Sequence, residues 1–293
     1  MNQVAGGAGV GEGEGAGDVD GADSDGIDRT ESRRSAGLAG RAPGVELPDL
    51  ERRFGGLRRL YGDAAYARIR AARVAVVGLG GVGAWAAEAL ARSGVASLTL
   101  IDLDHVAESN INRQVQAVGA TLGQSKVQAL RERIADIHPG CEVIGVEEFA
   151  DEQNWPALLP HAVDTVIDAC DQVRAKCAIA AWALQTGSGL VVVGAAGGKR
   201  QPQAVQVDDL ALVTHDPLLA ALRQRLRQQH GAARSGVMGV RCVFSREAVA
   251  APVQGSSSDG SLNCAGYGSG VVVTATFGMV AASLALEFAA VQK

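Results

Sequence analysis

The stretch Arg73-Val-Ala-Val-Val-Gly78-Leu-Gly80-Gly81-Val-Gly83 decides the fold of this chain. An apolar run ends in four glycines within six residues, and a segment typical of a helix follows at 84–92. In such an order a buried strand leads into a loop whose glycines let a ligand approach the backbone closely. The unpaired N–H groups of the first helical turn then attract negative charge. The stretch therefore predicts a nucleotide site, either of a dinucleotide-dependent oxidoreductase or of an ATP-using adenylating enzyme.

Strand and helix signals alternate downstream of this stretch. Apolar runs typical of buried strands occupy residues 74–77, 97–101, 141–146, 163–169 and 190–194. Segments with helical spacing lie between them, at 81–93, 122–137 and 174–186. Short apolar strands joined by helices form parallel sheets that are covered on both faces. We therefore expect an α/β fold with a Rossmann-like, mainly parallel sheet and helices on both faces.

After Gly197 the pattern becomes less regular and predicts a C-terminal α/β extension. Two more strands are expected at 204–207 and 241–244. Between them Pro217 opens a leucine-striped helix, with Asp216 as its N-cap.

The last apolar run, 271–291, is long enough to cross a bilayer. It contains Glu287 as well as threonine and serine, and no basic anchor directly precedes it. We therefore expect a buried core helix there rather than membrane association.

The acidic charge is concentrated at the N-terminus. Residues 1–44 hold eight acids against four arginines, which is most of the net charge of −5. The same segment has twelve glycines and almost no bulky apolar residue, so it cannot bury enough surface to offset chain entropy. We expect a disordered tail. Because the tail lacks the apolar run of a secretory signal and is too acidic for a mitochondrial transit peptide, we expect a cytoplasmic protein.

The cysteines support neither a disulfide framework nor a zinc site. There are five of them, with no CxxC motif: Cys141, Cys170, Cys177, Cys242 and Cys264. In a reducing cytosol, thiols at such spacings are most often buried apolar side chains.

The polar loop after the second strand separates the two nucleotide hypotheses. Asp102 ends that strand, and its carboxylate can accept hydrogen bonds from the ribose of NAD or ATP alike. Farther on, Arg113 and Lys126 supply two cations, which a triphosphate requires and a dinucleotide does not. Asn110 can hold phosphate or ribose. Each of these residues alone has an ordinary surface explanation, but the ordered set favours ATP.

Asp171 follows the strand at 163–169, at the edge where open α/β sheets bind their ligands. A carboxylate there can hold Mg²⁺ against triphosphate oxygens. We expect Asp168 to serve the structure, and we do not take the position of Cys170 beside Asp171 as evidence for a nucleophile.

Together these residues resemble the adenylating superfamily of ubiquitin-activating enzymes, ThiF and MoeB. The likeness spans about residues 52–195 and includes Asp-x-Asp-x-Val-x-x-Ser-Asn-x-x-Arg-Gln after the glycine loop. It implies an ATP-binding domain that adenylates a carboxylate with Mg²⁺ and usually works as a homodimer. It implies nucleotide contacts from Gly78, Gly80, Gly81, Gly83, Asp102, Asp104, Asn110, Arg113, Gln114 and Lys126. It also implies catalysis by Asp171, Arg113 and Lys126, with Asp171 on the metal.

Arg53 resembles the arginine that this superfamily extends into the partner subunit's nucleotide site. The neighbouring Arg52 competes for the same role.

Within the superfamily the closer resemblance is to the tRNA threonylcarbamoyladenosine dehydratases. It rests on the glycine loop and on Arg53-Phe-Gly-Gly56, Arg59-Leu-Tyr-Gly62, Asp216-Pro-Leu218, Cys242-Val-Phe-Ser-Arg-Glu247 and Asn263-Cys-Ala-Gly-Tyr-Gly-Ser269. The missing CxxC pairs separate the chain from MoeB and ThiF. The resemblance implies one ThiF-type domain at 45–293, with an ATP-binding core at 45–197 and a substrate-binding part at 198–293.

This family acts on the threonylcarbamoyl group of adenosine 37 in tRNA. ATP converts its carboxylate to an acyl-adenylate, and the neighbouring carbamoyl group closes a ring with loss of AMP. Because the nucleophile is already on the substrate, no enzyme cysteine is required. A tRNA needs a cationic surface, for which the sequence offers Lys199, Arg200, Arg223, Arg225, Arg227, Arg234, Arg241 and Arg246.

Three other functions remain open at this stage. A ThiF- or MoeB-type enzyme would activate a protein carrier and, with a desulfurase-type partner, pass sulfur through Cys170, Cys177 or Cys264. An NAD-dependent oxidoreductase and a non-catalytic interaction module are the others. The triphosphate set argues against the last two, and the absence of CxxC pairs argues against the first.

Overall fold

The computed structural model describes residues 48–250 and 267–291. These residues belong to one compact unit that begins at Pro48. The predicted disordered tail at 1–44 and the candidate thiol Cys264 lie outside the described residues.

The unit is built on one seven-stranded sheet with the order β3-β2-β1-β4-β5-β7-β6. Every neighbouring pair runs parallel except β6 and β7, which are antiparallel. The strands are β1 (Arg73–Val77), β2 (Ser97–Ile101), β3 (Glu142–Val146), β4 (Thr165–Asp168), β5 (Gly189–Val193), β6 (Val205–Asp209) and β7 (Arg241–Ser245). The predicted Rossmann-like, mainly parallel sheet is confirmed. Since β7 pairs with β5, the C-terminal extension continues the same sheet.

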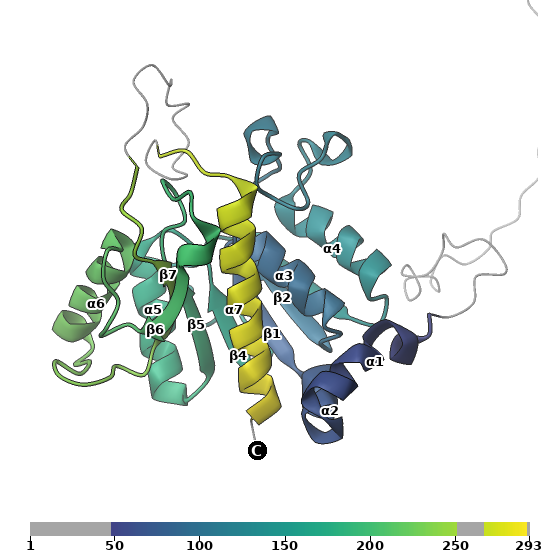
Figure 1. Cartoon of the computed structure of the whole chain (residues 1–293), viewed down its shortest axis with the longest axis horizontal. Helices are drawn as coiled ribbons and strands as arrows, with labels where there is room; N and C mark the ends of the chain where they lie inside the picture. The colour runs from purple at the N-terminus through teal and green to yellow at the C-terminus, as the bar shows by residue number, and fades with distance from the viewer. Residues whose placement is uncertain (1–47, 251–266, 292–293) are drawn as a thin grey trace, which may run out of the picture. The chain divides into compact units, whose positions relative to one another are not determined.

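Helices cover both faces of the sheet, as the sequence predicts. One apolar core joins the sheet to α3 (Gly83–Arg92), α4 (Lys126–Ile137) and α7 (Val271–Val291). A second core lies on the opposite face, under α5 (Val173–Thr186) and α6 (Pro217–Gln229). Figure 1 shows α7 crossing in front of the sheet beside α3. Helices thus cover both faces of the central strands, and the carboxyl edge of the sheet is where a ligand can enter.

Within the described residues, α7 is the one helix long and apolar enough to span a membrane. Half of its most apolar window is buried inside the protein, where it packs against α3, α2 and the central strands. Phe277, Ala281 and Ala285 are fully buried, whereas Val272 and Met279 face outward. Burial of this kind is what a core helix of a layered α/β protein requires.

Two helices were not predicted, namely α1 (Leu50–Tyr61) and α2 (Asp63–Ala71). A Gly-Gly pair and four arginines make the first of them look like a loop. It forms because Asp49 caps its N-terminus, accepting from Arg52 N at 3.0 Å, and because Phe54 is buried against His138.

The start of α4 also differs from the prediction, at Lys126 instead of residue 122. Gly123 has φ +80°, which breaks the helix, and Ser125 caps the helix that follows. This later start places Lys126 on the first turn.

Candidate functional site

One cleft of about 510 Å³ runs along the carboxyl edge of the sheet. Its walls come from the ends of six strands, from β3 at one end to β7 at the other, from the segments that follow them, and from the first turns of α4, α6 and α7. This size is typical of a site for a nucleotide or another small molecule. The cleft contains most of the predicted site: Gly78, Gly80, Gly81, Asp102, Asp104, Arg113, Gln114, Lys126 and Asp171.

The glycine loop shows why these positions are glycines. Gly78 has φ +85°, and a Cβ there would lie 2.9 Å from the backbone of Ala169 and Cys170. A Cβ on Gly83 would lie 1.8 Å from the carbonyl oxygen of Gly78. At Gly80 nothing lies within 4 Å, so its backbone is open to a ligand. Gly83 does not line the cleft; it allows α3 to pack closely against the loop.

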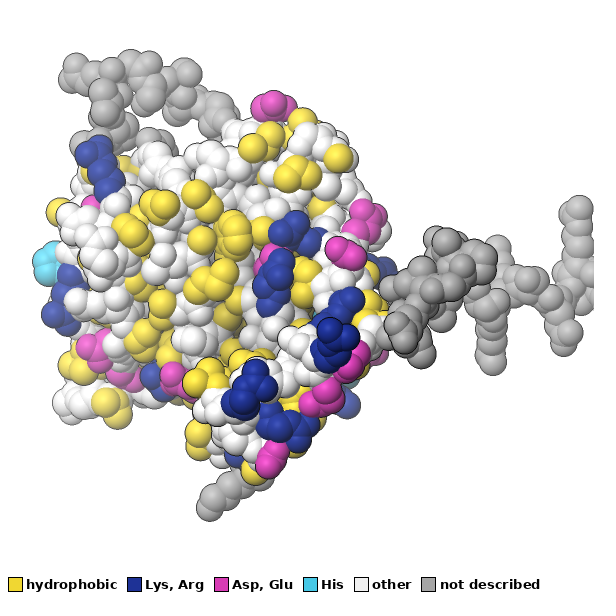
Figure 2. Space-filling view, turned by 45° about the vertical axis from the view of Figure 1, so that its right-hand side comes forward, with side chains coloured by type: hydrophobic (Ala, Val, Ile, Leu, Met, Phe, Trp, Pro, Cys, Tyr) yellow, Lys and Arg dark blue, Asp and Glu magenta, His cyan; other side chains and the backbone are white. Residues whose placement is uncertain are grey.

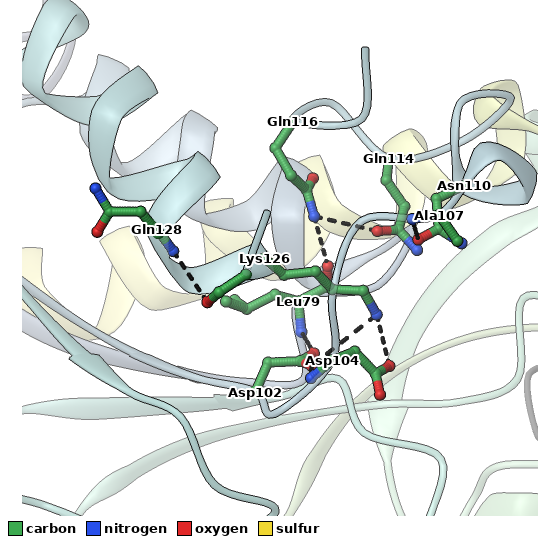
Figure 3. Close-up of polar contacts among 10 residues, drawn as sticks. Leu79, Asp102, Asp104, Ala107, Asn110, Gln114, Gln116, Lys126 and Gln128 are labelled. Carbon is green, nitrogen blue, oxygen red and sulfur yellow. Dashed lines mark hydrogen bonds and ion pairs between the residues drawn. The ribbon is translucent and has the colours of Figure 1, made fainter. Parts of the chain in front are cut away.

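Side chains clamp the backbone of Leu79 inside this loop (Figure 3). Asp102 accepts a hydrogen bond from Leu79 N at 2.6 Å, and Gln116 Nε2 donates to Leu79 O at 3.0 Å. Both side chains are buried, and Gln116 also donates to Gln114 at 3.1 Å. The loop is therefore held in shape before any ligand arrives. Sequence reasoning missed Gln116, because a glutamine downstream of a motif carries no sign of what it will contact.

Lys126 lies between two carboxylates at the end of β2. Its Nζ donates to Asp104 Oδ2 at 2.7 Å and lies 3.9 Å from Asp102 Oδ1 (Figure 3). The lysine side chain is 3% exposed, whereas that of Asp104 is 42% exposed. Burial raises the pKa of Asp102, and Lys126 opposes this rise. The Lys126 ammonium thus lies at the cleft wall, and its partly exposed partner Asp104 is free to turn toward solvent.

Asn110 closes the turn that presents Arg113 and Gln114. Its carbonyl accepts from both of their backbone N–H groups, at 3.0 and 2.9 Å, and its side chain accepts from Ala107 N at 3.1 Å. Asn110 is buried and is not among the residues that line the cleft, so its predicted contact with phosphate or ribose stays a prediction. Arg113 does line it, and its guanidinium rests on the carbonyl of Ser109 at 2.6 Å.

Asp171 is exposed at the cleft just after β4, as predicted. The residues before it are held by Asp168, whose Oδ1 accepts from Cys170 N at 3.2 Å and from Cys170 Sγ at 3.0 Å. Lys176, fully buried on α5, donates to the same oxygen at 3.1 Å and to the Asp168 carbonyl at 3.1 Å. Asp168 therefore serves the structure, as expected, while Lys176 was not foreseen.

The donor set fits Mg²⁺ bound together with a phosphate, and not a metal held by protein alone. No group of three or more His, Cys, Asp or Glu side chains suited to a metal occurs among residues 48–250 and 267–291. Mg²⁺ is commonly held by one or two carboxylates and the oxygens of a bound phosphate. Asp171 is a carboxylate of that kind, since it is exposed and faces the cleft.

Two of the described thiols, Cys170 and Cys177, are poorly suited to nucleophilic chemistry. Burial and then the Asp168 carboxylate hold the pKa of Cys170 well above its usual value. Burial raises the pKa of Cys177 to about 11. The thiolate is the reactive form of cysteine, so neither group is activated for sulfur transfer.

Arg53 lies away from the cleft of its own chain. It is exposed on α1, and its guanidinium donates to the carbonyls of Asp136 and Ile137 at 3.1 and 2.7 Å, at the C-terminal end of α4. It does not line the cleft, so it cannot touch a ligand bound there without a large movement.

The cations predicted for tRNA contact are mostly engaged within the chain. Lys199 is buried, and its ammonium donates to the carbonyls of Ser245 (3.2 Å) and Glu247. Arg223 donates to the carbonyls of Leu210 and Val213, and Arg225 pairs with Glu152 at 3.0 Å. Lys199 thus supports the backbone around it, and its phosphate contact stays a prediction.

The other predicted cations are nearer to solvent. Arg227 is half-buried and donates to the Ala233 carbonyl at 3.1 Å, whereas Arg200 is exposed.

Two aromatic side chains at opposite ends of the cleft were also missed. Phe149, just beyond β3, is 50% exposed, and Tyr267, before α7, is 38% exposed. Large aromatic rings with this exposure are available to a ligand. Tyr267 lies within the Asn263–Ser269 segment that carries the family resemblance, but the sequence assigned it no role, and no motif marks Phe149.

Comparison with known proteins covers nearly the whole described unit. The ThiF family matches residues 53–291. The tRNA threonylcarbamoyladenosine dehydratase of Escherichia coli (strain K12) is 43% identical over 251 residues, covering 80% of this chain and 92% of that protein. The enzyme of the same name from Haemophilus influenzae is 38% identical, covering 83% and 95%. A crystal structure of the E. coli enzyme in complex with ATP has a TM-score of 0.75, covering 83% of this chain and 96% of that one.

Proposed function

The chain belongs to the ThiF family, and from this premise we propose that it uses ATP to adenylate and then cyclise the threonylcarbamoyl group of adenosine 37 in tRNA. The observation that carries the proposal is the arrangement of the cleft. A phosphate-binding centre of Gly80, Gly81, Arg113 and Lys126 is joined to a further half toward β5 and β7, which leaves room for a second substrate. The names of the similar enzymes, and the ATP bound in one of them, support the same activity.

We place the triphosphate of ATP against the open backbone of Gly80 and Gly81. Lys126 would exchange Asp104 for phosphate oxygens, and Arg113 would provide a second charge-assisted contact. The nucleoside would then extend toward β2 and β3, where Phe149 offers an aromatic surface for adenine. Asp102, already committed to Leu79 and Asp104 through their N–H groups, retains acceptor capacity for a ribose hydroxyl.

Asp171 would hold Mg²⁺, which neutralises phosphate charge when it is bound. The chain keeps this carboxylate in place through the Asp168–Cys170 hydrogen bonds beneath it.

The proposed reaction has two balanced steps. A carboxylate oxygen of the substrate attacks the α-phosphorus of ATP, and pyrophosphate leaves with the electron pair of the broken P–O bond. The carbamoyl group then attacks the activated carbonyl carbon, AMP leaves, and a proton is lost as the ring closes. Positioning and neutralisation of charge are the main tasks of the enzyme, because both reacting groups belong to the substrate.

We further propose that the enzyme works as a homodimer in which Arg53 serves the partner subunit's site. Its exposed position on α1, outside its own cleft, supports this role.

Phosphates of the tRNA would be drawn to α1 and α2, which carry six arginines against two acids. Figure 2 shows Lys and Arg side chains gathered on this part of the surface, mixed with acidic ones. Arg58 there is already paired with Glu51 and Asp63, and Arg68 donates to the Ala290 carbonyl, so Arg52 and Arg59 are the better candidates.

The experiment that tests the activity is mass spectrometry of adenosine 37 after incubation of modified tRNA with the protein, ATP and Mg²⁺. We expect the cyclised nucleoside and one AMP for each ring formed. The Asp171→Asn variant should lose about 10²–10³-fold in turnover with an unchanged melting temperature, because the side chain is exposed and acts on charge. Formation of the ring at the normal rate by this variant would contradict the assigned role.

The alternative, activation of a protein carrier for sulfur transfer, makes a different prediction. It requires a reactive thiol, and the raised pKa values of Cys170 and Cys177 weigh against it. Cys264 lies outside the described residues. If Cys264→Ser abolishes sulfur transfer to a carrier peptide while pyrophosphate release with that peptide continues, the sulfur-transfer function replaces ours.

A further inference from the structure

Building on the proposed function, we propose that the half of the cleft toward β5 and β7 binds the target nucleobase, with the Tyr267 ring as its stacking partner. Four steps support this assignment: the order of the strands, the chemistry of the walls, the anchoring of Tyr267 and the contrast with Phe149.

The order of the strands divides the cleft into two halves. From one end to the other, the carboxyl ends belong to β3, β2, β1, β4, β5 and β7, with neighbours about 4.8 Å apart. Gly80 and Gly81 lie in the loop after β1, Arg113 and Lys126 lie in the segment after β2, and Asp171 follows β4. These phosphate-binding and metal-binding groups therefore lie around the middle of the strand order. Asp102 at the end of β2 directs the ribose to one side. The other side, beyond Asp171, is left for the acceptor whose carboxylate must reach the α-phosphorus.

The walls of this second half are apolar and uncharged. They are formed by Gly194, Ala195, Ala196, Gly197, Pro217, Leu218, Val249, Tyr267 and Ser269. Asp216 lies next to them, but its carboxylate is occupied, accepting from Ala195 N at 2.8 Å and from Leu219 N at 3.0 Å. A flat, neutral nucleobase suits such walls, and single bases of RNA are bound by stacking on aromatic side chains. Only the carboxylate of the acceptor is charged, and it must leave this lining to reach the α-phosphorus.

The backbone around Tyr267 is anchored to the phosphate side of the cleft. Gly198 N donates to Gly268 O at 2.9 Å, and Asn112 Nδ2 donates to Ser269 O at 2.8 Å. Asn112 directly precedes Arg113, so the segment carrying the ring is tied both to the loop after β5 and to a phosphate-binding cation. A ring fixed in this way can position a base relative to ATP.

Phe149 provides a built-in comparison, since it is the other exposed aromatic ring of the cleft and lies at the opposite end. If the two halves bind different substrates, removal of each ring must affect a different substrate. A single elongated ATP site would give no such separation.

The test is steady-state kinetics of tRNA cyclisation for the wild type, Tyr267→Ala, Tyr267→Phe and Phe149→Ala. Loss of one base stack corresponds to a fall of about 5- to 150-fold in kcat/KM for tRNA in Tyr267→Ala. We expect its KM for ATP to change less than twofold, and Tyr267→Phe to recover most of the loss because it keeps the ring. Phe149→Ala should show the reverse pattern, with a raised KM for ATP. Thermal melting of each variant checks its fold.

Binding of the free nucleoside N6-threonylcarbamoyladenosine, measured by calorimetry with a non-hydrolysable ATP analogue, separates the two proposals. Weaker binding by Tyr267→Ala than by the wild type supports the subsite. Normal cyclisation and equal nucleoside binding in Tyr267→Ala would overturn the subsite and leave the proposed function standing. Failure of the wild type to cyclise tRNA, together with pyrophosphate release on a carrier peptide, would overturn both.

Discussion

Two buried lysines, Lys126 on α4 and Lys176 on α5, lie in similar positions near the carboxyl edge of the sheet but differ in their access to a ligand. Each lies in the first two turns of a helix and pairs with an aspartate at the end of a strand, at 2.7 Å for Lys126 with Asp104 and at 3.1 Å for Lys176 with Asp168. Lys126 lines the cleft, and Asp104 is partly exposed, so the pair can open to receive phosphate. Lys176 and Asp168 are both 0% exposed, and no ligand can reach them.

The difference shows that burial of a charge does not by itself mark a ligand site. Both lysines share the low solvent access that strengthens an ion pair, and both would be costly to leave unpaired. The difference is that Lys126 can reach a ligand phosphate in the cleft, whereas Lys176 is fully buried with Asp168. We therefore expect removal of Lys126 to affect catalysis first, and removal of Lys176 to affect stability first.

The largest expected effect is that of Lys176→Met on stability. The substitution leaves Asp168 buried without its cation, and one oxygen of that carboxylate already lacks a partner. The free energy of unfolding should fall by about 3–5 kcal/mol, measured by urea denaturation.

The matched control is Asp168→Asn combined with Lys176→Met, which removes both charges. Stability should recover in part, because no uncompensated charge is then buried. A loss below about 1 kcal/mol in the single variant would show that the pair carries little of the stability.

The next largest effect is that of Lys126→Met, which tests whether the second lysine serves catalysis more than stability. We expect turnover to fall about 10²–10³-fold, as when one charge-stabilising donor is removed from an active site. Its effect on stability should be smaller than that of Lys176→Met, because Asp102 keeps the hydrogen bonds from Leu79 N and Asp104 N. Pyrophosphate release and urea denaturation of the same preparation measure both quantities. If stability falls more than turnover, the distinction between the two lysines is wrong.

The smallest expected effect concerns Glu88, a third buried acid with partly exposed partners. Burial raises the pKa of its carboxyl, but hydrogen bonds from Arg133 and Arg92 outweigh burial and lower it below the usual 4.5. The ionised Glu88 carboxylate, held by Arg133 and Arg92, therefore stabilises the fold above pH 4.5, and this stability is lost as the pH falls through the lower pKa of the folded state.

Glu88→Gln should remove this dependence and cost about 1 kcal/mol at pH 7. Urea denaturation from pH 3 to pH 7 measures the difference. Parallel stability curves for Glu88→Gln and the wild type would mean that the two arginines do not stabilise the ionised form.

The predictable part of the site is the part encoded locally. Gly78, Asp102, Arg113 and Asp171 follow strand ends or belong to one continuous loop, so the order of the sequence is enough to place them at one edge of the sheet. Gln116 contacts Leu79 on a distant segment, and Tyr267 reaches the cleft from a segment far away in the chain, and no local pattern indicates either arrangement.

The arginines and lysines of the C-terminal part show what charge alone leaves open. A basic helix was expected to face RNA, and in the structure Arg223 of that helix donates to backbone carbonyls, as does Lys199 outside it. Long cationic side chains can satisfy buried carbonyls as readily as they face solvent, and only packing decides between the two.

The sequence by itself determined the parallel α/β sheet, the glycine loop and the preference for a triphosphate, because these depend on periodicity and on residues that are close together in the chain. Tertiary structure decided which buried lysine can meet a ligand, which glycines and amides only support the loop, and that two aromatic rings lie at opposite ends of one cleft. These properties depend on the order of the strands and on contacts between distant segments, which bring together side chains that the linear sequence keeps apart.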